Sequence, residues 1–189
     1  KGVGMLYARR GIILTNLIEG GAQERGKRGG TENVPGIAAM AAALKEACAN
    51  MDENTKKVTA LRDKLIDGIS KIPHCALNGA RAPRLPGNVN FCFEGIEGES
   101  LLLLLEAKGI SASSGSACTS GSLDPSHVLL AIGRPHEVAH GSLRLTICED
   151  NTEEEIDYIL AELPPIVDYL RNMSPVWKDL MSGKRQFTL

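Results

Sequence analysis

Apolar residues recur every three or four positions along several stretches of this chain, and that spacing predicts helices. The clearest case is a helix expected over residues 54–72, where Val58, Leu61 and Leu65 fall on one face. A stretch rich in Ala, Leu and Met predicts a separate helix before it, over residues 31–50. Further helices are expected over residues 99–108, 125–132, 152–170 and 175–181.

Strict alternation of apolar and polar residues predicts strands instead. Strands are expected over residues 2–9, 89–93, 110–112 and 142–148. In the last of these, Leu143 and Leu145 share one face, which leaves Arg144 and Thr146 together on the other. A few scattered strands among more numerous helices indicate an α+β fold, with a small sheet covered by helices on one face.

Single residues mark where some of the helices begin or bend. Thr152 and Glu155 have the spacing of a capping box, which predicts a helix start at that point. Pro164 and Pro165 are expected to kink or interrupt the helix that follows. Asp124 is the expected N-cap of the helix over residues 125–132.

Composition narrows the range of functions. A chain of 189 residues can bury one full core, or one domain with an appended segment. A net charge of −2 and 4% aromatic residues argue against a nucleic-acid partner, and no apolar run approaches the roughly 18 residues that cross a membrane. The five cysteines are odd in number and lack CxxC spacing, so neither a disulfide framework nor a zinc site is expected. A reducing cytoplasm fits this composition best.

One cysteine, Cys118, lies in an unusual run of small polar residues over 113–122. Gly and Ser disfavour both helix and strand, so this run predicts a loop. A structural cysteine more often lies in an apolar, periodic segment, whereas a thiol on a mobile loop can meet another molecule. An incidental thiol on a surface loop is the alternative.

Three blocks of sequence resemble one enzyme family. Residues 109–127, around Cys118, resemble the cysteine loop of cysteine desulfurases of the NifS/IscS class, which belong to the class V aminotransferases. Residues 23–33 resemble the family's phosphate-contacting segment, and residues 140–146 resemble its substrate-carboxylate strand. The blocks follow the family's order over residues 1–180.

The resemblance implies a fold of the type I class that binds pyridoxal 5′-phosphate. Residues 1–45 would be the end of the large cofactor-binding domain. Residues 46–189 would form the small C-terminal domain, a mostly antiparallel sheet with helices on one face, carrying a mobile cysteine loop over about 113–123. The chain is expected to begin just after the lysine that holds the cofactor, and therefore to be a C-terminal portion that is inactive alone and lacks bound cofactor.

The same resemblance assigns the site residues. Cys118 would take sulfur from L-cysteine as a persulfide, leaving L-alanine, and deliver it to an iron–sulfur scaffold protein, either housekeeping or specific to nitrogen fixation. Arg144 would bind the substrate carboxylate, with a structural salt bridge as the alternative. Thr31 would contact the cofactor phosphate of the other subunit in a homodimer, with an ordinary helix cap as the alternative. No resident metal is expected, although Cys118 is a candidate transient ligand of an iron–sulfur cluster.

Several points stay open from the sequence. The base that activates Cys118 is one of three histidines, namely His127, His136 and His140. Cys48 is expected to be a small core residue, as are Cys75 and Cys92. Two other functions compete with a desulfurase: a selenocysteine lyase of the same cofactor class, and a non-catalytic sulfur-carrier or docking module.

Overall fold

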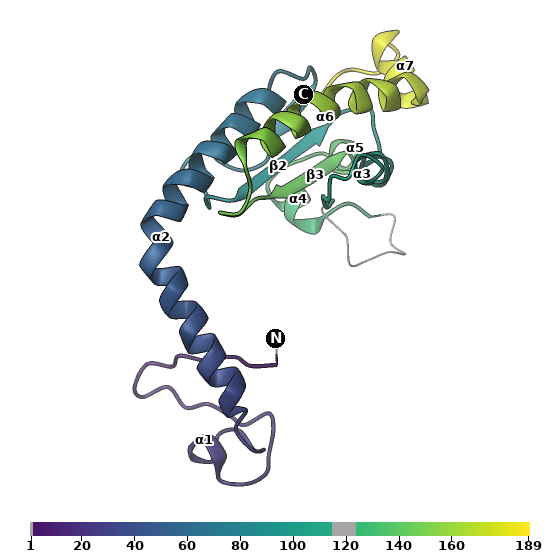
Figure 1. Cartoon of the computed structure of the whole chain (residues 1–189). Coiled ribbons are helices and arrows are strands. Elements are labelled where there is room, and N and C mark those ends of the chain that lie inside the picture. The colour runs from purple at the N-terminus through teal and green to yellow at the C-terminus, as the bar shows by residue number, and fades with distance from the viewer. Residues whose placement is uncertain (1, 115–123) are drawn as a thin grey trace. The chain divides into compact units, whose positions relative to one another are not determined.

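A computed structural model describes residues 2–114 and 124–189 of the chain (Figure 1). The chain divides into two compact units, Lys1–Asp52 and Glu53–Leu189. One helix, α2 (Val34–Ile69), belongs to both units. The prediction of two separate helices in this region was wrong, because no Gly or Pro lies between residues 37 and 67 to end the helix. The predicted domain boundary after residue 45 stays a prediction.

The first unit contains little regular structure before α2. Only α1 (Gln23–Gly26) precedes it, and the predicted strand over residues 2–9 is wrong. A strand needs a neighbouring strand for its backbone hydrogen bonds, and no described segment pairs with these residues. Asn33 caps α2, since its Oδ1 accepts a hydrogen bond from the Gly36 N–H at 3.1 Å.

The second unit is built around an antiparallel sheet of three strands in the order β1-β2-β3. The strands are β1 (Cys75–Leu77), β2 (Asn88–Phe93) and β3 (Ser142–Thr146). The predicted α+β class with a small antiparallel sheet is confirmed. The strand predicted over residues 110–112 is wrong, and an isolated bridge between Ser113 and Arg144 follows directly after these residues.

One face of the sheet carries the main core. The second half of α2, α3 (Gly98–Glu106) and α6 (Glu153–Met173) cover this face (Figure 1). The most deeply buried of its large side chains are Leu65, Ile69, Phe91, Phe93, Leu101, Leu105, Leu143, Ile156 and Leu163. Because the apolar side chains of the strands fill this face, their polar side chains lie on the opposite face.

Two short helices cover part of that opposite face. Leu129 from α4 (His127–Ala131) and Val138 from α5 (His136–Ala139) form a small cluster with Cys92 of β2. Helices therefore cover one face fully and one end of the other.

The C-terminal helices follow the sequence pattern closely. The capping box of Thr152 and Glu155 is present at the start of α6, which confirms that prediction. Pro164 and Pro165 lie within α6 without interrupting it. The last helix, α7 (Pro175–Met181), begins at the proline, as predicted. The cap of α4 is Ser126 rather than the predicted Asp124.

Candidate functional site

Arg144 lies in the middle of β3 on the polar face of the sheet. Its neighbours Leu143 and Leu145 are buried in the core, so the alternation that the sequence predicted is present. The guanidinium is exposed, and Nη2 donates a hydrogen bond to Ser113 Oγ at 3.3 Å. A strand flanked by packed leucines holds the base of this side chain in a fixed place.

The Arg144 guanidinium has no carboxylate partner among the residues that the structure describes. The remaining internal segment, residues 115–123, contains no Asp or Glu. The structural salt bridge that competed with a substrate role is therefore not found. A guanidinium without a carboxylate partner can bind an incoming carboxylate through two parallel hydrogen bonds.

Four residues form a polar row across the sheet: Asn78, Asn90, Arg144 and Ser113. Asn90 is the direct partner of Arg144 in the β2–β3 register, and Ser113 bridges Arg144 on its other side. Asn78 directly follows β1 and donates its backbone N–H to the carbonyl oxygen of Asn90 at 2.8 Å. Paired residues of neighbouring strands share a face, so these side chains lie next to one another.

Cys118 and most of its loop lie outside the described residues. The two ends of the loop are described. Ser113 and Arg144 exchange two backbone hydrogen bonds, of 2.6 and 3.1 Å, and the loop departs two residues later. At the other end, Pro125 and Ser126 are buried directly before α4. The fold thus places Ser113, near the start of the predicted loop, beside Arg144.

The three candidate histidines do not form one group. The rings of His136 and His140 meet edge to face, with 4.7 Å between their centroids. His136 Nε2 is 4.0 Å from a carboxylate oxygen of Asp124, at the far end of the loop. His127 is the exposed first residue of α4. The choice of a base for Cys118 stays open among them.

Thr31 lies on the first unit, exposed, three residues before α2 begins. The helix-cap alternative for this residue is wrong, because Asn33 provides the cap. The neighbouring Gly30 has a φ of +103°, a conformation that L side chains rarely adopt. The phosphate contact of Thr31 stays a prediction.

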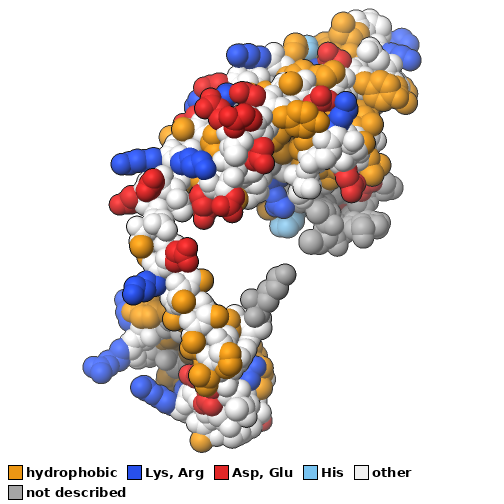
Figure 2. All heavy atoms as spheres, viewed as in Figure 1, with side chains coloured by type: hydrophobic (Ala, Val, Ile, Leu, Met, Phe, Trp, Pro, Cys, Tyr) orange, Lys and Arg blue, Asp and Glu red, His pale blue; other side chains and the backbone are white. Residues whose placement is uncertain are grey.

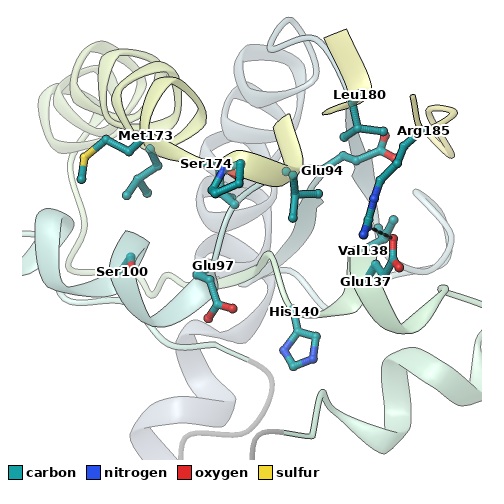
Figure 3. Close-up of a pocket in the computed structure, with 15 residues that line it drawn as sticks. Glu94, Glu97, Ser100, Glu137, Val138, His140, Met173, Ser174, Leu180 and Arg185 are labelled. Carbon is teal, nitrogen blue, oxygen red and sulfur yellow. Dashed lines mark hydrogen bonds and ion pairs between the residues drawn. The ribbon is translucent and has the colours of Figure 1, made fainter. Parts of the chain in front are cut away.

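A cavity of about 460 Å³ opens near the C-terminal helices (Figure 3). Its lining is apolar on the side of α6 and α7, through Met173 and Leu180, and carries the ion pair between Arg185 and Glu137. His140 lies on its wall, as Figure 3 shows. Arg144 and Thr31 do not line it, so of the candidate site residues that the structure describes only His140, the neighbour of His136, lies on this cavity.

The described cysteines are all free thiols but differ in exposure. Cys48 and Cys148 are exposed, Cys75 is half-buried and Cys92 is buried. The expectation that Cys48 is a core residue was wrong, because its stretch of α2 buries no side chain. Burial raises the pKa of the Cys92 thiol, and hydrogen bonding from Asn78 opposes this to a smaller extent.

The sequence analysis missed the residues that surround Asn90. Arg134 Nε donates to Asn78 Oδ1 at 2.7 Å, and Asn78 Nδ2 donates to Asn90 Oδ1 at 2.6 Å. These two bonds join residues 56 and 12 positions apart. No spacing in a single sequence signals such contacts.

Comparison with known proteins shows the family of the chain. The aminotransferase class-V family matches residues 1–159. The chain therefore belongs to that family. Among its relatives, a cysteine desulfurase IscS from Clostridium botulinum is 56% identical over 189 residues, 98% of this chain and 48% of the relative. The cysteine desulfurase NifS of Azotobacter vinelandii is 52% identical over 178 residues, 94% of this chain and 44% of the relative.

Solved structures give the same class. A NifS-like protein matches with a TM-score of 0.76 and 36% identity, over 87% of this chain and 42% of the other. A second NifS-like protein, from Rickettsia africae, matches with a TM-score of 0.73 and 29% identity, over 83% and 41%. The chain spans about half the length of the curated relatives that it matches. The resemblance to cysteine desulfurases of the NifS/IscS class is thus confirmed.

Proposed function

We propose that the whole protein to which this chain belongs is a cysteine desulfurase, which removes sulfur from L-cysteine and leaves L-alanine. The observation that carries the proposal is the Arg144 guanidinium, which has no acidic partner among the described residues and lies at the base of the loop of Cys118. A group that can bind a carboxylate, placed beside the start of the segment that contains Cys118, is an arrangement that this reaction can use.

Arg144 would hold the substrate by its α-carboxylate. The two N–H groups on one edge of a guanidinium match the two oxygens of a carboxylate, which fixes the direction of the amino acid as well as its position. Ser113 accepts a hydrogen bond from Nη2 and restrains the guanidinium before substrate arrives. Binding at this point would leave the side chain of the substrate free to approach the loop.

Cys118 would act as the sulfur acceptor. Its thiolate attacks the substrate sulfur and forms a new S–S bond, while the C–S bond of the substrate breaks and the β-carbon takes a proton to give alanine. Cys118 is four positions beyond Ser114, and a chain advances at most about 14 Å over four positions. The thiol proton would pass to one of the histidines near the loop, His127, His136 or His140.

Pyridoxal 5′-phosphate, when bound, supplies the electron sink for this chemistry. Among the described residues, Thr31 could contribute one contact to the cofactor, because its hydroxyl is exposed and can donate a hydrogen bond to a phosphate oxygen. The N–H of Gly36 at the start of α2 is already bonded to Asn33. Most contacts to the cofactor would come from outside this chain, and the chain alone is proposed to be inactive.

A second subunit and a recipient protein complete the proposal. Residues 2–52 expose many apolar side chains, which supports burial against a partner or against the rest of the protein. The protein would be a homodimer in which Thr31 approaches the cofactor of the other subunit.

The persulfide of Cys118 would pass to an iron–sulfur scaffold, with Cys118 a transient cluster ligand. Free thiols at four described cysteines support a reducing cytoplasm.

Mass spectrometry of the full-length protein after reaction with L-cysteine tests the proposal. The parent protein should gain the mass of one sulfur atom on the peptide that contains Cys118, with one alanine formed. The Cys118→Ala variant should keep the absorption band of the bound cofactor and release no sulfide. Cys148→Ala is the matched control, because Cys148 is exposed yet lies beyond the end of β3.

Three outcomes would contradict the proposed function or favour one of the alternatives. Unchanged sulfide release by Cys118→Ala would refute the acceptor role. Turnover of L-selenocysteine without turnover of L-cysteine would indicate a selenocysteine lyase. A protein that accepts persulfide from a donor but has no cofactor absorption would be a sulfur carrier.

A further inference from the structure

We infer that Asn90 is a second donor to the substrate carboxylate beside Arg144, and that Arg134 and Asn78 position it. Asn90 would be a binding residue, whereas Arg134 and Asn78 would act through it. The inference rests on the proposed function, since it assigns a further group to the same carboxylate site.

The place of Asn90 in the sheet is the first support. Asn90 and Arg144 are direct partners in the β2–β3 register, so their side chains rise from the same face as neighbours. The buried side chains of Val89 and Phe91, on either side of Asn90, fix its backbone in the core. A ligand held by the guanidinium of Arg144 is therefore within the reach of the adjacent amide.

The second support is that the Asn90 amide can be oriented without ambiguity. Arg134 can only donate hydrogen bonds, so the atom of Asn78 that meets its Nε must be the oxygen. The NH₂ group of Asn78 then faces Asn90, and the atom of Asn90 that it meets must also be an oxygen. The NH₂ group of Asn90 consequently points away from Asn78.

Asn78 itself has no freedom to turn over. It is 5% exposed, and its NH₂ group also donates to the Cys92 sulfur at 3.2 Å. Its backbone carbonyl oxygen accepts a hydrogen bond from Arg84 Nη2, which holds the main chain at this residue in place. A turn of the amide would bring its NH₂ group against the guanidinium of Arg134 and leave both unsatisfied, at a cost that burial makes large.

Arg134 contributes orientation rather than an ion pair. Its Nη2 donates to the Leu77 carbonyl oxygen at 2.6 Å, and no carboxylate pairs with it among the described residues. The positive charge therefore remains near the polar row, where it also favours an anion. Its two bonds both end on the strand segment of Leu77 and Asn78.

The third support is an unused donor. The NH₂ group of Asn90 has no acceptor among the residues that the structure describes, although Asn90 is partly buried. Arg144 likewise lacks an anionic partner there. Two adjacent donors, one charged and one neutral, match the two oxygens of one carboxylate.

Steady-state kinetics of the full-length enzyme test the inference. Asn90→Ala removes the donor and should raise the KM for L-cysteine about tenfold, as expected for one hydrogen bond to a charged group. The kcat should change less than twofold, because the bond forms with bound substrate as well as in the transition state. Arg134→Gln should give a smaller rise in KM of the same kind, and Arg134→Lys should restore part of it.

Asn88→Ala is the matched control. Asn88 is on the same face of β2, and its Oδ1 accepts a hydrogen bond from Arg84 Nη1 at 3.0 Å, but it lies opposite Thr146 rather than Arg144. Its KM should stay within twofold of the parent value. An Asn90→Ala variant with an unchanged KM would overturn the inference. If Arg144→Gln also left the KM unchanged, the carboxylate site of the proposed function would fall with it.

A second measurement does not depend on activity. In ¹⁵N-labelled protein titrated with L-alanine, the side-chain amide signals of Asn90 should shift, and those of Asn88 should not. Arg134→Gln should reduce the shift at Asn90. Absence of a shift at Asn90 would overturn the inference whatever the kinetics show, including the case in which folding of a variant is impaired.

Discussion

At the scale of single residues, neighbouring side chains decide whether a group is reactive or structural. Arg144 remains available for an anion because the leucines beside it enter the core and because no described carboxylate pairs with it. Cys92, on the same face, is enclosed by α4 and α5 and has a raised thiol pKa. The same sheet face thus holds an exposed guanidinium and a buried thiol.

Alkylation of the native chain with iodoacetamide should separate the described thiols. Cys148 and Cys48 should react within minutes, because both are exposed. Cys92 should react only after unfolding, because it is buried and its raised pKa lowers the thiolate fraction at neutral pH. Peptide mass spectrometry at several times would check this, with denatured protein as the control. Rapid native labelling of Cys92 would contradict the enclosure by α4 and α5.

The sequence predicted correctly those features that depend on residues close together in the chain. The exposed position of Arg144 followed from alternation along one strand, and the class of enzyme followed from three short motifs. Asn78 and Arg134 could not be predicted, because their importance comes from contacts between segments far apart in the chain. Cys48 was misassigned because an apolar composition does not show which stretch of a helix meets the core.

At the scale of elements, α6 shows how a few polar residues fix a helix start. Glu155 N donates to Thr152 Oγ1 at 3.3 Å, and the Glu155 carboxylate accepts the Thr152 N–H at 3.1 Å. Thr152→Ala removes the first of these bonds and should lower the free energy of unfolding by about 1 kcal/mol. Urea unfolding would measure it, and Thr152→Ser, which keeps the hydroxyl, is the control. An equal loss in both variants would contradict the capping role.

The same cap should make stability depend on pH. Hydrogen bonds from the Asn151 side chain and then the Thr152 N–H hold the pKa of the Glu155 carboxyl below its ordinary value. A lowered folded-state pKa gives stability that is present above the unfolded pKa, about 4.3, and is lost as pH falls through the folded value. The stability difference between parent and Glu155→Gln should therefore shrink as pH falls from about 6 to about 3. A constant difference in urea titrations would count against it.

Helix boundaries were harder to predict than helix identity. The sequence predicted two helices where α2 runs without a break, because the first was inferred from composition and the second from an apolar stripe. The two prolines of α6 are tolerated within a helix whose buried face is held by Leu163, Ile166 and Val167. In α6 tertiary packing outweighed the local signal of the prolines, whereas in α2 the absence of Gly or Pro between residues 37 and 67 lets the helix continue.

At the scale of the whole molecule, the two units differ in how much they bury. The buried hydrophobic side chains of the described residues all fall between Val58 and Leu180. Residues 2–52 instead expose apolar side chains, and Figure 2 shows hydrophobic groups on the surface. The most exposed of these are Met5, Leu6, Tyr7, Ile12, Ile13, Leu17, Val34 and Met51. Because the relatives are about twice as long, we expect this surface to be covered in the whole protein.

Limited proteolysis of the chain should reveal this difference directly. A segment that buries few apolar groups opens at little cost in free energy, so trypsin should cut first at Arg9, Arg10 or Arg25. Residues 53–189 should persist as a resistant product, because opening them exposes the core around Leu65. Mass spectrometry of the products over time identifies each cut. In the full-length protein the early cuts should slow at least tenfold if the apolar surface of residues 2–52 is covered there. Equal cleavage rates in the two proteins would mean that nothing covers this surface.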